Sequence, residues 1–550
     1  MRLIERRIGL LFAAFLLCFL VIVGRALWLQ GVQGSSLASQ ALSQQTETIA
    51  VPGLRGSLLD RRGNELAASE DAATIYATPY QVKNPPLAAE KLARVLELKP
   101  AEVLAALTEE SGFSYIAQKV PLEQAARIER LDLEGIGALP DSRRTYPQGE
   151  MAGQVIGSVG SENEGLNGLE MGEEEVLGGS DGERRIVTDA LGDAIRLETI
   201  ETAEDGEDIQ LTLDPMIQEQ TEKALAEIGE TYTPKGATAI VVDPRSSQIL
   251  AMANWPPVDP NDLSEVSNED LMNRATGFTY EPGSTFKAFT VAAALQDKTV
   301  TPASSFTLPP TIEVADRTIE ESHERGTETL SVGQILAQSS NVGAVTIGQE
   351  IGDEKFSKWI DKFGFGRPTK VQFPGEEQGI VPSLDEYSGS TIGNLPLGQG
   401  LSVTPMQMIA GYAAIANGGL LKRPQLIKRI GEEPIHEPKG KRVISPEVAA
   451  EVREMLEGVL APGGTASEVS VPGYTLAGKT GTAQVPENGT YSKTKYIASF
   501  IGFAPAQNPQ LLAAVIVDQP QGEIYGGSVA APAFGEIASF ALPYLGVAPE

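Results

Sequence analysis

The sequence predicts an α+β fold that follows an N-terminal membrane helix. Three observations indicate this: an uncharged run of 17 residues from Ile8 to Gly24, two β-like runs near residue 240, and two more near the C-terminus with helical segments between. Strands at both ends of a segment and helices in its middle are typical of an α+β domain whose sheet is assembled from both ends. A chain of 550 residues is long enough for two or three domains.

The composition excludes several kinds of chemistry. The chain has 43 Lys and Arg, 73 Asp and Glu, 2 His and 1 Cys, and its net charge is −30. This acidity offers no basic surface for phosphates, so no nucleic-acid partner is expected. Two histidines argue against a Ser-His-Asp triad or a histidine zinc site, and one cysteine excludes an intramolecular disulfide framework. Any catalysis must therefore use neither histidine nor a thiol.

The N-terminal segment predicts a single-pass membrane protein. Three arginines lie among the first seven residues, and Arg25 interrupts the apolar character that continues to Leu29. If Arg25 reaches the membrane interface, the helix spans residues 8–29. The basic residues before the span place residues 1–7 in the cytoplasm and the remainder outside the cell membrane. A cleaved signal peptide is the alternative, but the small residues Ser36-Leu37-Ala38 lie far beyond a normal cleavage distance.

The exported part divides by sequence character near residue 208. Residues 30–207 contain short β-like runs, a helical stretch from Pro86 to Leu107 and a region rich in glycine and acidic residues from Gly160 to Glu183. In residues 208–550, Ile209 to Asp214 is predicted as a strand and Pro215 to Ile228 as a helix, with Asp214 as its N-cap.

Further elements of the second domain follow from turn residues and apolar periodicity. Thr404-Pro405 is expected to open a helix that ends at Gly418-Gly419, with cap, N1 proline and terminal glycine in place. The predicted strands are Ala237 to Val242, Gln248 to Ala253, Ile497 to Phe503 and Leu511 to Val517.

The first chemical motif pairs Ser284 with Lys287. Pro282 and Gly283 break the chain before Ser284, so a helix is expected to start there, and the i, i+3 spacing puts Lys287 on the same face. A helix N-terminus suits a negatively charged serine oxygen, and a serine nucleophile needs a base beside it, which a neutral lysine can supply. This pair alone does not establish a nucleophile and its base, because Ser492 and Lys495 have the same spacing. A surface lysine beside a capping serine would explain each of the two pairs.

The second motif is Ser339-Ser340-Asn341, at the end of a predicted helical segment that starts at Leu330. A serine and an asparagine two residues apart can present a hydroxyl and an amide to one cleft. Ordinary loop polarity at a helix C-terminus is the alternative, and Ser161-Glu162-Asn163 has the same form.

The third motif is Lys479-Thr480-Gly481-Thr482, and the tripeptide Lys-Thr-Gly occurs only here. A strand edge with small residues lets a substrate backbone pair alongside it. Lys479 would supply a fixed positive charge, and the hydroxyls of Thr480 and Thr482 would bind a carboxylate. A glycine turn with a surface lysine is the alternative.

In this order and at wide spacing, the three motifs resemble those of the penicilloyl-serine transferase superfamily, Ser-x-x-Lys, Ser-x-Asn and Lys-Thr-Gly. Residues 55–63, 144–149 and 165–170 are similar to motifs of the non-catalytic pedestal of class B penicillin-binding proteins. Further segments are similar to the septal, division-type members: residues 339–343, 403–405, 461–465 and 525–527. The resemblance covers nearly the whole chain after the membrane helix.

The resemblance implies the fold and the domains. A pedestal (dimerisation-type) domain of elongated mixed α/β structure is expected at residues 30–207. A transpeptidase domain with an antiparallel sheet flanked by helices is expected at residues 208–550.

The resemblance also implies a peptidoglycan D,D-transpeptidase that needs no cofactor. Ser284 would attack the penultimate D-Ala carbonyl of a donor stem peptide, and Lys287 would be the general base, its pKa lowered by Lys479 and by burial. Ser339 would relay protons, and Asn341 would hold Lys287 and the substrate amide. The backbone N–H groups of Ser284 and Thr482 would form the oxyanion hole. Lys479, Thr480 and Thr482 would bind the terminal carboxylate, and Gly481 would be a further substrate-binding residue.

The partners implied are stem peptides as donor and amine acceptor, and β-lactams as covalent inhibitors. A polytopic membrane glycosyltransferase and other proteins of the cell-wall synthesis complex would bind through residues 8–29 and the pedestal. A role in septal wall synthesis is favoured over elongation on motif similarity alone.

Other functions stay open as alternatives. A β-lactam hydrolase would need a deacylating carboxylate and no pedestal. A bifunctional class A protein would need a glycosyltransferase domain where the pedestal motifs lie. A scaffold or β-lactam sensor with a dead site is disfavoured by the intact Ser284, Lys287, Asn341 and Lys479.

Overall fold

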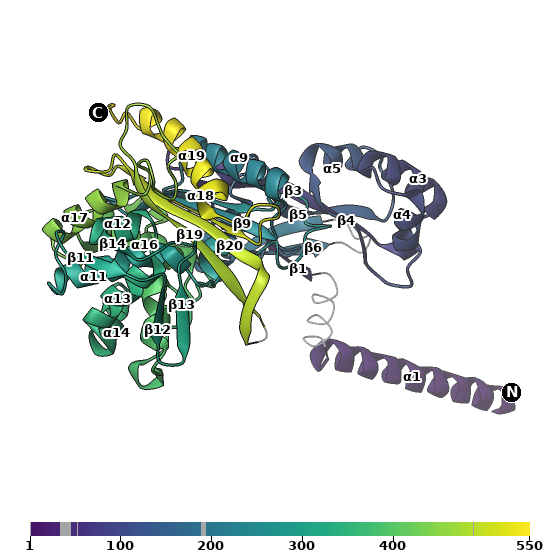
Figure 1. Cartoon of the computed structure of the whole chain (residues 1–550). Helices are drawn as coiled ribbons and strands as arrows, with labels where there is room; N and C mark the ends of the chain where they lie inside the picture. Colours follow the sequence, from purple (N-terminus) through teal and green to yellow (C-terminus); the bar gives the residue numbers. More distant parts are fainter. Residues whose placement is uncertain (1, 34–45, 52, 189–193, 488) are drawn as a thin grey trace. The chain divides into compact units, whose positions relative to one another are not determined.

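The computed structural model of the chain describes residues 2–33, 46–51, 53–188, 194–487 and 489–550 (Figure 1). Contacts divide the chain into two compact units. The smaller consists of Met1–Leu54, Asp71–Ser142 and Gly179–Gly206, and the larger of Arg55–Glu70, Arg143–Gly178 and Glu207–Glu550.

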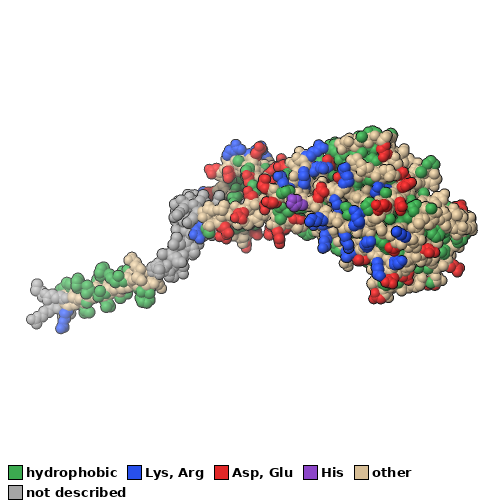
Figure 2. Space-filling model, turned by 90° about the vertical axis from the view of Figure 1, so that its left-hand side faces the viewer, with side chains coloured by type: hydrophobic (Ala, Val, Ile, Leu, Met, Phe, Trp, Pro, Cys, Tyr) green, Lys and Arg blue, Asp and Glu red, His purple; other side chains and the backbone are tan. Residues whose placement is uncertain are grey.

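The N-terminal helix α1 (Arg2–Gly31) has the length and character of a membrane span. Its segment Arg6–Gly31 is the one helix in the described part of the chain that is long and apolar enough to cross a membrane. Its apolar side chains are exposed, and Figure 2 shows them along the helix surface. Such a surface is stable in lipid rather than in water, which is consistent with the predicted single-pass anchor. Ser36 to Ala38 lie outside the described residues.

In the smaller unit, three helices pack with strands around a small core of alanine, valine, leucine and isoleucine side chains. The predicted helical stretch from Pro86 to Leu107 is two helices, because Glu97 adopts the left-handed conformation (φ 58°) and Pro100 starts a new helix. The three helices are α3 (Pro85–Leu96), α4 (Pro100–Leu107) and α5 (Leu122–Glu129), and the short 3-10 helix η1 (Pro79–Gln81) precedes them. The strands are β1 (Thr46–Val51), β6 (Gly182–Thr188) and β7 (Ala194–Glu201), in the order β1-β6-β7, with β4 (Ser114–Pro121) and parts of β3 (Glu65–Ala77) and β5 (Ile136–Thr145).

The larger unit is built on a five-stranded antiparallel sheet of order β10-β9-β21-β20-β19. Its strands are β9 (Gly236–Asp243), β10 (Gln248–Trp255), β19 (Ala477–Glu487), β20 (Thr490–Ala504) and β21 (Leu511–Asp518). The prediction of a sheet assembled from both ends of the segment is confirmed. Strand β20 begins seven residues before the predicted start at Ile497, because it forms a long hairpin with β19 as far as Glu487 and Thr490.

Helices cover both faces of this sheet (Figure 1). On one face lie α9 (Pro215–Tyr232) and α19 (Ala531–Tyr544), and on the other α11 (Lys287–Gln296), α16 (Pro405–Ala416) and α17 (Pro446–Glu457). The strand period of two divides the apolar side chains of β9 between two cores: Ala239 and Val241 face α9, whereas Ile240 and Val242 face the other way. The predicted fold class is confirmed.

The predicted helix caps are present. Asp214 accepts hydrogen bonds from the backbone N–H groups of Met216 (3.2 Å) and Ile217 (3.4 Å), and Thr404 forms a reciprocal capping box with Gln407. The strand before α9 is shorter than predicted, β8 (Ile209–Leu211), because the chain then leaves its sheet to enter the helix.

The remaining elements of the larger unit are short. Its helices are α6 (Gly153–Ile156), α7 (Gly168–Gly172), α8 (Glu174–Leu177), α10 (Arg274–Gly277), η2 (Gly283–Phe286), α12 (Val332–Ala337), α13 (Asn341–Ile351), α14 (Asp353–Lys362), η3 (Leu384–Glu386), α15 (Thr391–Asn394), η4 (Leu395–Leu397) and α18 (Gly526–Val529). Its strands are β2 (Leu58–Leu59), β11 (Ser305–Leu308), β12 (Thr311–Val314), β13 (Arg317–Glu320), β14 (Glu328–Ser331), β15 (Leu420–Leu421), β16 (Ile427–Ile430), β17 (Glu433–Pro434) and β18 (Lys441–Arg442).

A buried ion cluster joins the three segments that resemble pedestal motifs. The Glu170 carboxylate is fully buried and accepts from Arg55 Nε (2.5 Å) and Arg144 Nε (2.7 Å). Arg55 also pairs with Glu174 at 2.8 Å. By their contacts, these residues belong to the same compact unit as the five-stranded sheet.

Replacing Glu170 with glutamine is expected to destabilise the larger unit by about 3–5 kcal/mol, because two guanidinium groups would remain buried without their shared carboxylate. Thermal unfolding of the full chain in detergent measures this. Glu175→Gln removes an exposed carboxylate five residues away, so it is the matched control and should leave the transition unchanged. Equal transitions for both variants would show that the ion cluster contributes nothing to stability.

Candidate active site

Ser284 lies in the 3-10 turn η2, which runs directly into α11. The turn is held on several sides: Thr285 Oγ1 donates to Pro282 O (2.7 Å), Tyr412 Oη donates to Thr285 O (2.6 Å), and Gly283 N donates to the carbonyl of Gly398 (3.0 Å). The helix start predicted at this serine is thus present, preceded by one tighter turn. Ser284 lines a cleft, and its hydroxyl forms no hydrogen bond with the described residues.

Lys287 is fully buried one turn beyond Ser284. Its Nζ donates to Ser339 O (2.6 Å), Asn341 Oδ1 (2.7 Å) and Ser339 Oγ (3.3 Å). These bonds fix the ammonium or amine group at the floor of the cleft and connect the first predicted motif directly to the second.

Lys479 is also fully buried and reaches the same hydroxyl from β19. Its Nζ donates to Ser339 Oγ (3.0 Å), Thr480 O (3.0 Å) and Thr480 Oγ1 (3.3 Å). Ser339 holds this position with a left-handed backbone (φ 59°). The three sequence motifs, nearly 200 positions apart, therefore meet at one serine oxygen between two lysines.

Burial changes the protonation of both lysines. Removal from water lowers the pKa of Lys287 to about 7, and the negative charge of Glu321 acts in the opposite direction. Burial and the positive charge of Lys287 lower the pKa of Lys479. Two neighbouring ammonium groups repel each other, so near neutral pH the lysine pair favours a total charge of +1 over a total charge of +2. A lysine of this pKa can accept a proton at neutral pH, as a general base must.

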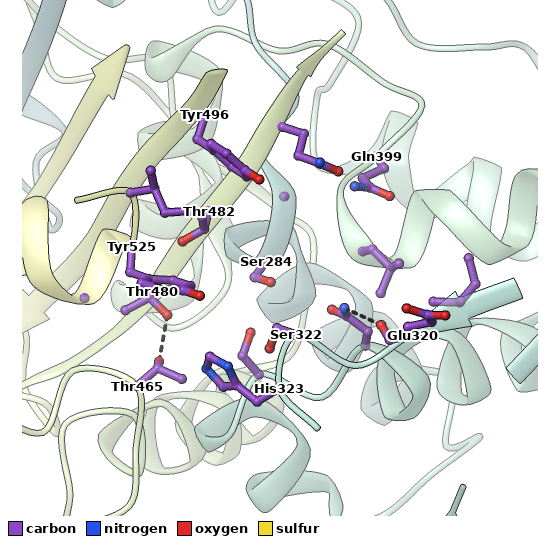
Figure 3. A pocket seen from close by; sticks show the side chains of 18 of the residues that line it. Ser284, Glu320, Ser322, His323, Gln399, Thr465, Thr480, Thr482, Tyr496 and Tyr525 are labelled. Carbon is purple, nitrogen blue, oxygen red and sulfur yellow. Dashed lines mark hydrogen bonds between the residues drawn. The ribbon is translucent and has the colours of Figure 1, made fainter. Parts of the chain in front are cut away.

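Ser339-Ser340-Asn341 lies between two helices, α12 and α13, and not simply at the end of one helix as the sequence suggested. Asn341 is the first residue of α13, and Ser340 caps that helix by accepting from Gly343 N (2.9 Å). The amide of Asn341 accepts from Lys287 and donates to Glu320 O (2.8 Å), a bond drawn in Figure 3.

The cleft has a volume of about 610 Å³. Figure 3 shows Ser284 at its centre, with Thr480 and Thr482 of β19 to its left and Ser322 and His323 below it. Its further lining residues include Arg317, Glu320, Gln399, Thr465, Gln484, Tyr496 and Tyr525. The hydroxyls of Thr465 and Thr480 are hydrogen-bonded at 2.7 Å, and Gly526 N donates to Thr482 Oγ1 (3.1 Å).

Gly481 lets β19 lie close to the nucleophile turn. A Cβ atom at this position would overlap Ser499 Oγ of the neighbouring strand β20, so an atom there must move, and it would also lie tightly against Thr285 Cγ2 (3.0 Å) and Pro282 O (3.1 Å) of the nucleophile turn. The glycine of the Lys-Thr-Gly motif is thus a packing requirement and not a turn.

Replacing Gly481 with alanine is expected to lower the rate of active-site acylation by about ten- to 100-fold, because the strand would be displaced from Ser284. A chromogenic cephalosporin reports this rate. Gly112→Ala, where nothing lies within 4 Å of the added atom, is the control and should acylate like wild type. A Gly481→Ala rate equal to wild type would refute the close-approach requirement.

Several residues of the site escaped the sequence-based prediction. Thr465 and Tyr525 fall in segments noted only for their family resemblance. Glu321, which accepts hydrogen bonds from Ser340 and Asn341, belongs to none of the predicted motifs. It is one of four acidic residues between positions 318 and 328, and the sequence does not distinguish it from the others.

An antiparallel sheet between helical layers, with a serine before one central helix and two buried lysines beside it, defines a penicilloyl-serine transferase. Residues 237–539 match the family model of the penicillin-binding protein transpeptidase domain, and residues 50–211 that of the penicillin-binding protein dimerisation domain.

Relatives and solved structures are similar to this chain over nearly its full length. Stage V sporulation protein D of Bacillus subtilis is 36% identical over 97% of this chain and 84% of its own length. The peptidoglycan D,D-transpeptidase FtsI of Escherichia coli is 31% identical over 100% of this chain and 93% of its own. The crystal structure of penicillin-binding protein 3 from Mycobacterium tuberculosis, complexed with ampicillin, has a TM-score of 0.72 at 29% identity and covers 91% of this chain and 97% of that one.

The chain belongs to the class B penicillin-binding proteins, the serine-type peptidoglycan D,D-transpeptidases that carry a dimerisation domain and a transpeptidase domain. The resemblance seen in the motifs and the prediction of an acyltransferase are confirmed. The relatives named above include FtsI and penicillin-binding protein 3, in agreement with the predicted similarity to septal members.

Proposed function

We propose that the protein cross-links stem peptides through an acyl-enzyme on Ser284. The observation that carries this assignment is the convergence of Lys287 and Lys479 on Ser339 Oγ at the floor of the cleft that Ser284 lines. Ser284 attacks the penultimate D-Ala carbonyl of the donor, its proton passes to Lys287, and D-Ala leaves. An amine of a second stem peptide then takes the acyl group.

The other predicted residues have roles that their contacts support. Ser339 lies within hydrogen-bond reach of both lysines, so it can relay the proton towards the leaving amine. Asn341 holds Lys287 through its side-chain oxygen. The backbone N–H groups of Ser284 and Thr482 form the oxyanion hole.

The terminal carboxylate of the donor binds to Thr480, Thr482 and Lys479, alongside Gly481. Because Lys479 is buried and its pKa is lowered, the arriving carboxylate supplies the negative charge that favours its protonated form. β-Lactams acylate Ser284 as covalent inhibitors that imitate the donor.

We further propose that the protein acts in septal wall synthesis, with α1 as its anchor and residues 1–7 in the cytoplasm. The similarity to FtsI supports the division role, and the basic residues before the apolar run support the orientation. Residues 30–207 would be the pedestal domain and residues 208–550 the transpeptidase domain. A polytopic membrane glycosyltransferase of the cell-wall synthesis complex would contact residues 8–29 and the pedestal.

The experiment supplies full-length protein with lipid-linked peptidoglycan precursor and a purified glycan polymerase, and analyses the muropeptides formed. Cross-linked dimers with release of D-Ala, both blocked by penicillin, are expected. Capture of penicillin without any cross-link would favour a sensor, and rapid release of hydrolysed penicillin would favour a hydrolase. Cell shape on depletion separates division from elongation: filaments are expected, and round cells would contradict the septal role.

A further inference from the structure

Glu321 is a buried carboxylate that neither the sequence motifs nor the mechanism above accounts for. It directly follows β13, and only 6% of its side chain is exposed. It lies against the Ser-x-Asn segment, which carries two of the groups that bind Lys287.

The carboxylate binds the first turn of α13 with both oxygens. Oε2 accepts from Asn341 N (2.7 Å), and Oε1 accepts from Ser340 Oγ (2.6 Å) and Val342 N (3.3 Å). Ser340 Oγ accepts in turn from Gly343 N. Glu321 thus satisfies the otherwise unpaired N–H groups of Asn341 and Val342 at this helix start and complements its dipole. Its remaining partner is the guanidinium group of Arg325.

The same segment fixes Lys287. Ser339 O and Asn341 Oδ1 are its two shortest partners, at 2.6 and 2.7 Å, and both belong to the Ser339–Asn341 segment that Glu321 binds through Ser340 and Asn341. Ser339 has a left-handed backbone, which a non-glycine residue keeps only where its surroundings hold it. A shift of this stretch would move the oxygen that both lysines share.

The charge of Glu321 also acts on Lys287. Burial opposes ionisation of Glu321, but hydrogen bonds from Ser340, Arg325 and Asn341 and the charge of Lys287 outweigh it, so its pKa is lowered. Its negative charge raises the pKa of Lys287 against the effect of burial. Among the described residues, the other charged or titratable groups around this segment include Lys479 on β19, Arg325, and Arg317, Glu320 and His323 at the cleft.

We propose that Glu321 is a positioning residue of the transpeptidation reaction, which holds the Ser339–Asn341 segment against Lys287 and supplies the negative charge that faces the paired lysines. The inference rests on the proposed role of Lys287 as the base. It explains why the base keeps enough affinity for a proton despite complete burial, and why the segment that connects the two lysines keeps one conformation.

The test measures the second-order rate constant of acylation of the full chain by a chromogenic cephalosporin between pH 5 and 9. For wild type the rate rises with pH as Lys287 loses its proton, with a midpoint near 7. Glu321→Gln removes the charge and keeps the shape, so Lys287 becomes neutral at lower pH. Its midpoint should fall by about one pH unit, and its high-pH rate should fall about tenfold as the base weakens and the segment loosens.

Arg325→Gln provides the opposite change and a second test. It removes the positive charge that offsets the charge of Glu321, so the midpoint of the acylation rate against pH should move to higher pH. Glu324→Gln removes an exposed carboxylate from the same segment and should leave both midpoint and rate as in wild type.

The role of Glu321 is overturned if Glu321→Gln and Arg325→Gln lower only the fraction of protein that acylates, with both midpoints unmoved, because that is the signature of a merely structural residue. The outcome is distinct from failure of the proposed function. If wild type is not acylated on Ser284, the proposed function fails; if wild type acylates normally and neither midpoint moves, only the role of Glu321 fails.

Discussion

Replacing Ser284 with alanine is expected to abolish covalent capture of β-lactams, with a loss of at least about 10⁴-fold in the acylation rate constant. The hydroxyl lies at the centre of this cleft, one turn before the buried Lys287, and neither lysine can substitute for it in an ester-forming step. Fluorescent penicillin followed by denaturing electrophoresis measures the capture.

Ser492→Ala is the matched control. Ser492 is followed at the same spacing by Lys495, yet it lies on the β19–β20 hairpin, where its hydroxyl accepts from Thr494 N and Lys495 N. Its variant should label like wild type. Undiminished labelling of Ser284→Ala, or loss of labelling in Ser492→Ala, would contradict the assignment of the nucleophile.

Replacing Lys287 with methionine is expected to lower the acylation rate by about 10³-fold. The methionine retains the volume of the side chain but removes the base, which contributes about 10²–10⁴ in rate in comparable proton transfers. Because the pKa of Lys287 is near 7, the wild-type rate should rise with pH through this region, whereas the variant should lose this rise. Stopped-flow acylation at several pH values checks both statements.

Lys495→Met is the control for this variant, since Lys495 is a partly exposed lysine paired with Glu487 and lies outside the cleft lining. Thermal unfolding must accompany the kinetics, because Lys287→Met leaves Ser339 O and Asn341 Oδ1 without their donor. A Lys287→Met protein that is folded and acylates at the wild-type rate would exclude Lys287 as the base.

The fold could be predicted where local sequence signals and tertiary packing agree. Asp214-Pro215 and Thr404-Pro405 mark helix starts because cap and N1 residues act locally. The helical stretch from Pro86 was predicted as one element because its composition hides the break at Glu97. The helix start at Asn341 was missed because its cap, Ser340, also forms part of a catalytic-type motif.

The residues of the covalent chemistry could be predicted from the sequence, but the residue that positions them could not. Ser284, Lys287, Ser339, Asn341 and Lys479 follow from three short motifs, and the structure brings their side chains together. Glu321 could not be found in this way, because its contacts depend on how β13 lies against α13, and no short spacing relates it to Asn341. The alternative of a surface lysine in a glycine turn is wrong for Lys479, since its side chain is fully buried.

The most direct test of the central claim is to map the residue that carries the acyl group. Wild-type protein is incubated with penicillin, digested with a protease and analysed by mass spectrometry. The account predicts a single penicilloyl adduct on the peptide containing Ser284. An adduct on any other residue, including Ser339 between the two lysines, would contradict it.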